Sequence, residues 1–269
     1  MKDLLVASVF ANSQRNETWL GLQRDFLQWS TSSFDHAVYL NHCPWSDSFR
    51  ASIIIGRRSE KIRTEPAKGS ADHAIGLTAV FDYFKEHKDY SFYLILDSDC
   101  FPVRRNWLPA LVQQMKSCHF AAPMRSENFE DYPHPCALFL TKESLDRAWT
   151  FAITPHSNRL GKKFVDLGCG LPTEGWFPLL RTNVYNPHPI FAAIYKHYFY
   201  HHGAGSRRPD FRNQSYYDHI KDHARVEAEI YGRLKTDPWK FVSELMGGDA
   251  LEPGPTFTMP APRAAAEQE

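Results

Sequence analysis

The chain has 269 residues, of which 43% are hydrophobic and 23% are charged, and its formal net charge is zero. This length can bury a large core, in one domain or in two small ones. The balanced charge creates no overall field that would attract nucleic acid, so we expect no nucleic-acid partner. No apolar stretch approaches the roughly 20 residues that cross a bilayer. The first residues carry one lysine and a very short apolar run, which predicts a first strand and no signal peptide.

The cysteines bear on the cellular compartment. There are five, they are scattered, and none are spaced as in a CxxC pair. This pattern predicts reduced thiols in a cytoplasmic protein, and it argues against a zinc site built on cysteine.

The first 150 residues alternate between strand and helix patterns. Apolar runs predict strands at residues 4–10, 37–40, 52–55, 92–96, 119–122 and 136–140. Apolar residues at helical spacing predict helices at residues 12–31, 69–84, 106–115 and 141–149. Such alternation is typical of an α/β fold, in which helices flank a sheet.

The pattern weakens beyond residue 150, where Gly and Pro are frequent. Residues 214–246 have a helical pattern that Gly232 and Pro238 should interrupt, and the rest is rich in Pro, Ala and Gly. The simplest partition is a catalytic domain at residues 1–212, a helical extension at 213–246 and a disordered tail at 247–269.

The most informative feature is the apolar run at residues 92–96, which Asp97, Ser98 and Asp99 follow directly. Such a run predicts a strand buried on both faces, and ligands of open α/β sheets bind beyond the carboxyl ends of strands. Side chains two residues apart on an extended segment point the same way, so both carboxylates can converge on one cation. Mg²⁺ and Mn²⁺ prefer such oxygen ligands. The alternative is that Asp-Ser-Asp only solvates a turn, and the buried strand before it favours a metal–diphosphate site.

The order strand, helix, strand, helix, long apolar strand and DxD resembles the GT-A glycosyltransferases of the family 2 and family 8 type. The resemblance covers residues 4 to about 205. It implies a Rossmann-like mixed sheet flanked by helices, Mn²⁺ or Mg²⁺ as cofactor, a nucleotide-sugar donor, and a glycan, lipid-linked or small hydroxyl acceptor. It further implies that Asp99 binds the metal directly, and that Asp97 contacts the ribose or a metal-bound water.

The same resemblance implies further donor-site residues. The helix before the DxD strand lines the nucleotide pocket in that family, which places Ser70, Asp72 and His73 there. The segment that begins at His202 resembles the family's HxxGxxKP motif, in which the histidine completes the metal shell and a basic residue contacts the diphosphate. We therefore expect His202 as a metal ligand, with His201 as the alternative, and Arg207 and Arg208 on the diphosphate.

Acceptor-side residues follow from the same resemblance. Asp166 or Glu174 is expected as the general base for the acceptor hydroxyl, with Asp166 preferred. His134 and Trp176 are expected to line the sugar or acceptor site. For each residue a structural role is the alternative, as a carboxylate bonded to loop amides, as part of a turn, or as a core tryptophan.

Other functions stay open at this stage. Residues 164–170, with the sequence FVDLGCG, resemble the first motif of S-adenosylmethionine-dependent methyltransferases, although Pro172 stands where another glycine is expected. A non-catalytic GT-A-like binding protein is the second alternative. The basic residues at 57–63 favour a solvated loop over contact with an anionic acceptor or a peripheral membrane surface.

Overall fold

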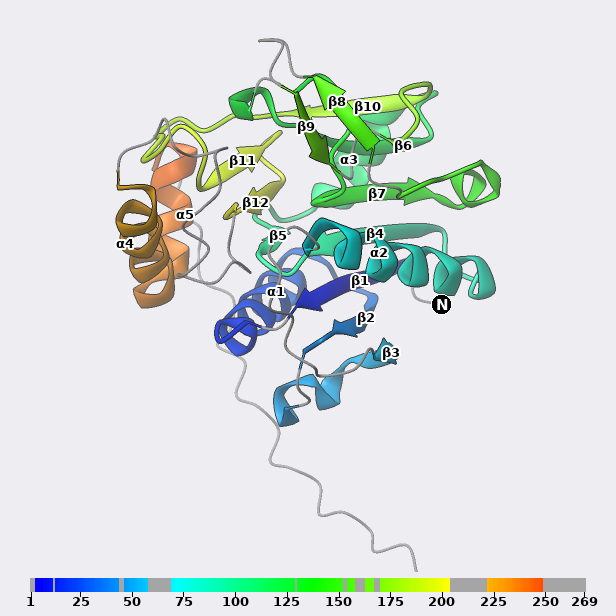
Figure 1. Ribbon diagram of the computed structural model, residues 1–269, viewed down its shortest axis with the longest axis horizontal. Helices are drawn as coiled ribbons and strands as arrows, with labels where there is room; N and C mark the ends of the chain where they lie inside the picture. Colours follow the sequence, from blue (N-terminus) through cyan, green and yellow to red (C-terminus); the bar gives the residue numbers. More distant parts are fainter. Residues whose placement is uncertain are drawn as a thin grey trace, which may run out of the picture.

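The computed structural model describes residues 3–11, 13–43, 46–57, 69–128, 130–151, 154–157, 163–166, 170–203 and 222–248. Its centre is a seven-stranded sheet in the order β10-β6-β7-β4-β1-β2-β3, and helices cover both faces (Figure 1). The strands of this sheet are β1 (Leu4–Ala11), β2 (Phe34–Asn41), β3 (Ile53–Arg57), β4 (Phe92–Asp97), β6 (Phe120–Met124), β7 (Ala137–Thr141) and β10 (Trp176–Leu180). The α-helices are α1 (Asn16–Ser30), α2 (Gly69–Glu86), α3 (Trp107–Met115), α4 (His223–Thr236) and α5 (Pro238–Met246).

Six of these seven strands run in the same direction. β1 pairs in parallel with β2 and β4, β2 pairs in parallel with β3, and β10 pairs in parallel with β6. β7 lies antiparallel to both β4 and β6, so it alone is reversed. The carboxyl ends of six strands and the amino end of β7 therefore meet at one edge of the sheet. The strand order reverses between β1 and β4, which is where α/β sheets open a ligand crevice.

The two faces of the sheet follow from the alternation of side chains along each strand. Leu5 and Ala7 of β1 belong to a core cluster with Leu77 and Val80 of α2. Leu4 and Val6 face the opposite side, where they join a cluster with residues of α1 and α3. Tyr93, Leu94, Ile95 and Leu96 of β4 are fully buried, and each such side chain contributes about 1.5–3 kcal/mol relative to exposure. Burial on both faces explains the unbroken apolar run of β4.

A glycine brings α2 close to the sheet. A Cβ atom at Gly76 would lie 2.6 Å from Cγ1 of Val9 and 3.3 Å from the ring of Tyr39. Only a residue without a side chain permits this approach of the helix to β1 and β2. The approach places the first turn of α2 at the carboxyl edge of the sheet.

A three-stranded sheet begins just beyond the carboxyl end of β4. It has the order β11-β12-β5 and consists of β11 (Ala193–Tyr195), β12 (Phe199–His201) and β5 (Cys100–Pro102), all antiparallel. A separate hairpin pairs β8 (Thr154–Ser157) with β9 (Lys163–Asp166). The small sheet brings residues near 200 next to the turn that follows β4.

The C-terminal helices belong to the main core. Ile230 of α4 and Phe241 of α5 share one buried cluster with Phe10, Trp19 and Phe26, and Trp239 stacks on Phe26 with ring centroids 4.0 Å apart. Figure 1 shows both helices beside α1 and β12. The helical extension is therefore packed against the α/β unit, and the boundaries of the proposed domains remain a prediction.

The structure confirms the predicted fold class, a mixed α/β sheet flanked by helices. The predicted helical region breaks before Pro238, where α4 ends and α5 begins, as expected. Two details differ: residues 142–146 form only a 3₁₀ helix, and Gly232 does not interrupt α4, since a glycine costs a helix only about 1 kcal/mol. The predicted basic loop lies outside the described residues from residue 58 to 68, as do residues 249–269 of the predicted tail. None of the helices in the described part of the chain is long and apolar enough to cross a bilayer.

Candidate metal and nucleotide site

The turn after β4 holds the carboxylate pair in place. Asp97 is the last residue of β4, and Ser98 and Asp99 form a buried turn into β5. The side-chain amide of Gln23 donates hydrogen bonds to the backbone carbonyls of Asp97 (2.7 Å) and Cys100 (2.9 Å). Gln23 is fully buried and in turn accepts from the Ser8 hydroxyl at 3.1 Å. One amide from α1 thus fixes both ends of the turn.

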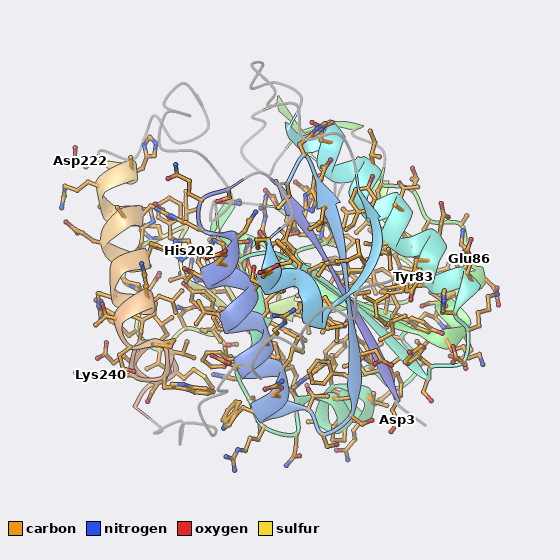
Figure 2. The ribbon with its side chains drawn as sticks, turned by 90° about the horizontal axis from the view of Figure 1, so that it is seen from below. Asp3, Tyr83, Glu86, His202, Asp222 and Lys240 are labelled. Atoms are coloured by element: carbon orange, nitrogen blue, oxygen red, sulfur yellow. The ribbon has the colours of Figure 1, made fainter. Side chains whose placement is uncertain are left out.

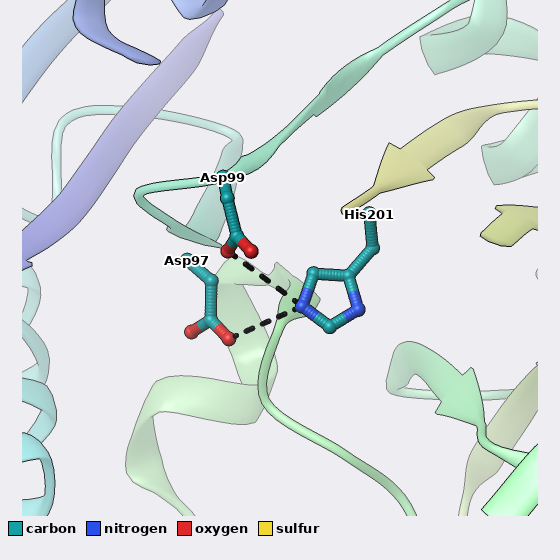
Figure 3. A group of neighbouring side chains, drawn as sticks. All are labelled: Asp97, Asp99 and His201. Carbon is teal, nitrogen blue, oxygen red and sulfur yellow. Dashed lines mark ion pairs between the residues drawn. The ribbon is translucent and has the colours of Figure 1, made fainter. Parts of the chain in front are cut away.

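His201 faces both carboxylates. Its Nε2 atom lies 3.7 Å from Asp97 Oδ2 and 3.7 Å from Asp99 Oδ1, as Figure 3 shows. The ligand atoms of these three residues all lie within 4.8 Å of one another. The cause is the register of the small sheet, in which His201 pairs with Cys100 and so comes beside the carboxylate turn. Two carboxylates and an imidazole are a donor set that suits Mn²⁺ or Mg²⁺.

The structure corrects the expectation that His202 would join the carboxylates. His202 is fully buried, and its Nε2 and Nδ1 atoms lie 2.8 Å from Glu227 and from the Tyr200 hydroxyl. Successive side chains at the end of a strand point to opposite sides. Because His201 faces the carboxylates, His202 faces α1 and α4 instead.

Asp97 has one oxygen directed toward each of two histidines. Oδ2 faces His201, and Oδ1 lies 3.3 Å from Nε2 of His73 on α2. Oδ1 is buried and accepts no hydrogen bond from any residue that the structure describes. Burial raises the pKa of Asp97, and the neighbouring His73 and His201 oppose that rise. A buried carboxylate oxygen without a hydrogen bond is costly, which fits a position meant for a ligand.

The first turn of α2 provides the next residues. Asp72 is buried, and its Oδ2 lies 3.7 Å from Nε2 of His42, which follows β2 in the left-handed backbone region (φ 53°). His73 faces Asp97, as described above. Ser70 is part of α2, but its side chain lies outside the described residues. The structure thus brings Asp72 and His73 to the carboxyl edge, on either side of the end of β1.

His134 also lies at this edge. Its backbone N–H donates to Pro123 at 2.9 Å, and its Nδ1 accepts from the Cys136 amide at 3.2 Å, which shapes the turn before β7. Its ring centroid is 6.3 Å from that of His201. Burial, and then the positive charge of Arg125, hold its pKa well below the ordinary value. His134 is therefore a turn residue that also borders the site.

The sequence interpretation missed a charged group after β6. Arg125 donates two hydrogen bonds to the fully buried Glu130, at 2.7 and 2.6 Å. Glu127 accepts from the Tyr195 hydroxyl at 2.5 Å. The available signal was their position directly after an apolar run, the same signal that identified Asp97.

Several predicted residues are not brought to the site. Trp176 pairs with Phe120 at the amino end of β6, packs against the core and donates from Nε1 to the Ala122 carbonyl at 3.0 Å. Glu174 precedes Trp176 and is exposed at this opposite edge of the sheet. The expectation that both lie at the donor or acceptor site therefore conflicts with the direction of β10. Asp166 is described only by its backbone in β9, and Arg207 and Arg208 lie outside the described residues.

Comparisons with known proteins give distant structural likeness only. No family model matches the chain, and no curated protein matches it. Protein A197 from STIV aligns with 77% of this chain and 97% of its own, at 11% identity and a TM-score of 0.37. A glycosyltransferase involved in glycosylation of the major capsid of PBCV-1 aligns with 54% of this chain and 62% of its own, at 11% identity and a TM-score of 0.33.

A third solved structure is the mannosyltransferase PcManGT from Pyrobaculum calidifontis in complex with GDP-Man and Mn²⁺. It aligns with 56% of this chain and 48% of its own, at 12% identity and a TM-score of 0.37. This chain therefore spans less than two thirds of either glycosyltransferase. TM-scores below 0.5 assign no function to it.

Proposed function

We propose that the chain is a metal-dependent glycosyltransferase, which transfers a sugar from a nucleoside-diphosphate sugar to a hydroxyl acceptor in the cytoplasm. One observation carries the proposal. Asp97, Asp99 and His201 meet at the carboxyl edge of the sheet, with one ligand atom from each within 4.8 Å of the other two.

The donor set fits a hard divalent cation. Asp99, Asp97 and His201 would hold Mn²⁺ or Mg²⁺, with Asp99 and His201 buried and Asp97 slightly exposed at the mouth of the site. A bound cation would neutralise the charge that develops on the departing nucleoside diphosphate. The turn keeps the two carboxylates at fixed positions. Gln23 holds the turn by its hydrogen bonds to the carbonyls of Asp97 and Cys100.

The nucleotide would lie between the metal site and α2. The amino end of α2 is at the same edge, and helix amino ends favour phosphate because their first N–H groups are unpaired. His73 contacts Asp97 and so borders both the metal site and this helix end. Ser70 and Asp72 remain proposed pocket residues, and Arg207 and Arg208 remain proposed diphosphate contacts through the family resemblance.

The acceptor side is less complete. Asp166 remains the proposed general base from the family resemblance. Glu174 is dropped, because it lies at the other edge of the sheet. Glu127 lies at the correct edge and is a second candidate, since one of its oxygens is held by Tyr195 while the other makes no hydrogen bond with the described residues. The stereochemical course of transfer depends on which carboxylate reaches the acceptor hydroxyl.

The methyltransferase alternative loses its structural context. Its motif requires a strand of a parallel sheet that enters a glycine turn and then a helix. Residues 163–166 instead form β9, which pairs antiparallel with β8 in a separate two-stranded sheet. A non-catalytic binding protein would use the same site as the transferase, so only turnover separates these two.

The test is a thermal-shift panel on the whole chain with UDP, GDP, dTDP, CDP and S-adenosylmethionine, each with Mn²⁺ or EDTA. A ligand at about 100 times its Kd adds roughly 2.7 kcal/mol to stability. Stabilisation by one nucleoside diphosphate that EDTA and Asp99→Asn both abolish is the expected result. Asp82→Asn is the matched control, because that carboxylate is 63% exposed on α2, away from the site.

Two outcomes contradict the proposal. Stabilisation by S-adenosylmethionine regardless of metal would favour the methyltransferase. Metal-dependent nucleotide binding without release of diphosphate from any matching sugar donor, even with a panel of hydroxyl acceptors, would favour a binding protein.

A further inference from the structure

His202 lies on the opposite side of β12 from the metal site, at the centre of a buried polar cluster. Its exposed fraction is 0%, and its ring centroid lies 5.1 Å from Trp19 and 6.1 Å from Tyr231. Figure 2 shows its labelled side chain beside α1 and α4. The cluster therefore joins the small sheet to helices from both ends of the described chain.

Both nitrogens of His202 have a hydrogen-bond partner. Its Nε2 atom lies 2.8 Å from Oε1 of Glu227, and its Nδ1 atom lies 2.8 Å from the Tyr200 hydroxyl. A carboxylate only accepts, so Nε2 carries the proton, and in the neutral imidazole Nδ1 accepts from Tyr200. These two bonds fix the orientation and the tautomer of the ring.

Glu227 is held from the other side by Arg15. Both of its oxygens accept from the guanidinium, one through Nη1 and one through Nη2 at 3.1 Å. The same guanidinium lies 3.9 Å above the centre of the Tyr231 ring. Burial opposes ionisation of Glu227, but the hydrogen bonds from His202 and Arg15 outweigh it and lower its pKa. Glu227 is therefore a fixed anion between α1, α4 and His202.

The cluster is connected to the metal site through the backbone. The His202 N–H donates to the carbonyl of Asp99 at 3.1 Å, and the His202 carbonyl accepts from Ala192 at 3.0 Å. His201 is the preceding residue, so a shift of His202 moves one metal-binding candidate directly and the other through this hydrogen bond. Groups that hydrogen-bond directly to metal ligands commonly change metal affinity by roughly 10- to 100-fold. This cluster acts one residue further out, so we expect an effect at the lower end of that range.

We infer that Glu227 is a positioning residue for the metal site and acts through His202 on His201 and Asp99. The inference rests on the proposed metal site, and it adds that α4 is part of that site's support. Without the anion at Glu227, His202 Nε2 loses its charged acceptor and Arg15 loses its counter-charge. The end of β12 is then held less firmly against the turn after β4.

The experiment measures Mn²⁺ affinity by electron paramagnetic resonance of the free ion, on the whole chain without nucleotide. Glu227→Gln keeps the size of the side chain but removes its charge, and we expect about tenfold weaker binding. Glu229→Gln is the matched control, because this residue is on the same helix, is 59% exposed and pairs only with Arg225 among the described residues. Its affinity should equal that of the wild type.

A second variant covers the case in which Glu227→Gln folds poorly. Tyr200→Phe removes only the hydroxyl that bonds to His202 Nδ1, and it should weaken Mn²⁺ binding in the same direction by a smaller factor. Circular dichroism at the assay temperature confirms that each variant is folded, so that a change in affinity is not a loss of folded protein.

The possible results separate this inference from the proposed function. Weaker binding in Glu227→Gln and Tyr200→Phe, with Glu229→Gln unchanged, supports it. Equal Mn²⁺ affinity in all four folded proteins overturns the positioning role and leaves the glycosyltransferase proposal intact. A wild type that binds no Mn²⁺ overturns both.

Discussion

The two sides of β12 carry adjacent histidines in opposite situations. On the side of Asp97 and Asp99, His201 Nε2 lies 3.7 Å from one oxygen of each carboxylate, which is too far for a hydrogen bond. On the other side, His202 and Glu227 meet at 2.8 Å, and both ring nitrogens are paired. The members of the first group are far enough apart to hold a cation between them. The members of the second group already hydrogen-bond to one another. We therefore propose a binding role for His201 and a supporting role for its neighbour His202.

The largest expected effect tests the side of β12 that carries His202. His202→Ala should destabilise the protein by about 2–4 kcal/mol, because it opens a cavity beside Trp19 and removes one hydrogen-bond partner from the partly buried Glu227. His201 is also buried, so His201→Ala opens a cavity too, but it should cost about 1–2 kcal/mol less because it removes no close hydrogen bond. Urea denaturation of both variants measures the difference. Equal destabilisation would mean that the two sides do not differ as the distances suggest.

The next effect tests the side of β12 that carries His201. Asp99→Asn should weaken Mn²⁺ binding by roughly 100-fold, about 2.7 kcal/mol, because it replaces a charged ligand with a neutral amide. The melting temperature without metal should stay the same or rise, since one of two neighbouring negative charges is gone. Titration calorimetry and thermal melting check the two halves of this prediction. A variant that binds Mn²⁺ normally but unfolds early would make Asp99 a structural residue.

A third prediction concerns a buried histidine that lies on neither side of β12. His36 of β2 has a buried Nε2 that makes no hydrogen bond with the described residues, and burial, followed by the charge of Arg24, lowers its pKa to about 3. The unfolded chain binds a proton near pH 6.5 and the folded chain does not, so stability is full above pH 6.5. It should fall by up to about 1.4 kcal/mol per pH unit as the pH drops toward 3.

Replacing His36 separates this effect from that of the carboxylates. The variant His36→Gln should show a shallower loss of unfolding free energy between pH 6 and pH 4 than the wild type, with Mn²⁺ affinity at pH 7 unchanged. If Mn²⁺ affinity also changed, His36 would influence the metal site. The contrast between the two sides of β12 would then be incomplete without it.

The smallest effect concerns the helix that carries His73. Gly76→Ala should cost about 1 kcal/mol, because a Cβ atom 2.6 Å from Val9 forces α2 away from β1, while the gain in helix propensity offsets part of that cost. The double variant with Val9→Ala relieves the clash and should recover helix docking. Because His73 on α2 contacts Asp97, a displaced α2 should weaken nucleotide binding. Thermal shift should therefore show weaker binding in Gly76→Ala than in the double variant. Equal binding would show that α2 tolerates the displacement.

Local patterns predicted much of the fold and part of the site. The apolar run of β4 and the carboxylates after it are neighbours in sequence, so their place in the structure follows from one segment. The choice between His201 and His202 depends on the register of β12 against β5, which joins residues about 100 positions apart. No local pattern carries that register, and an error of one residue inverts the direction of every side chain.

The same reasoning explains the misplaced acceptor residues. Trp176 and Glu174 lie at the edge opposite the carboxylates because β10 runs parallel to β6. The amino-acid composition of a strand does not predict its direction in the sheet. Residues 142–146 have the spacing of a helix, but the chain turns after one 3₁₀ segment, where Trp149 packs against Phe81 and Phe120. Tertiary packing outweighs propensity in such short segments.

The contact between Arg15 and Glu227 also sets an order of events during synthesis. Its partners are separated by 212 residues. At roughly 5–20 residues per second, the ribosome adds that length in about 10 to 40 s. For that interval Arg15 has no partner on α4. The DxD turn is made 128 residues before Glu227, so the nascent chain holds this turn without α4 for about 6 to 26 s. The proposed metal site therefore gains its proposed support only after α4 has emerged.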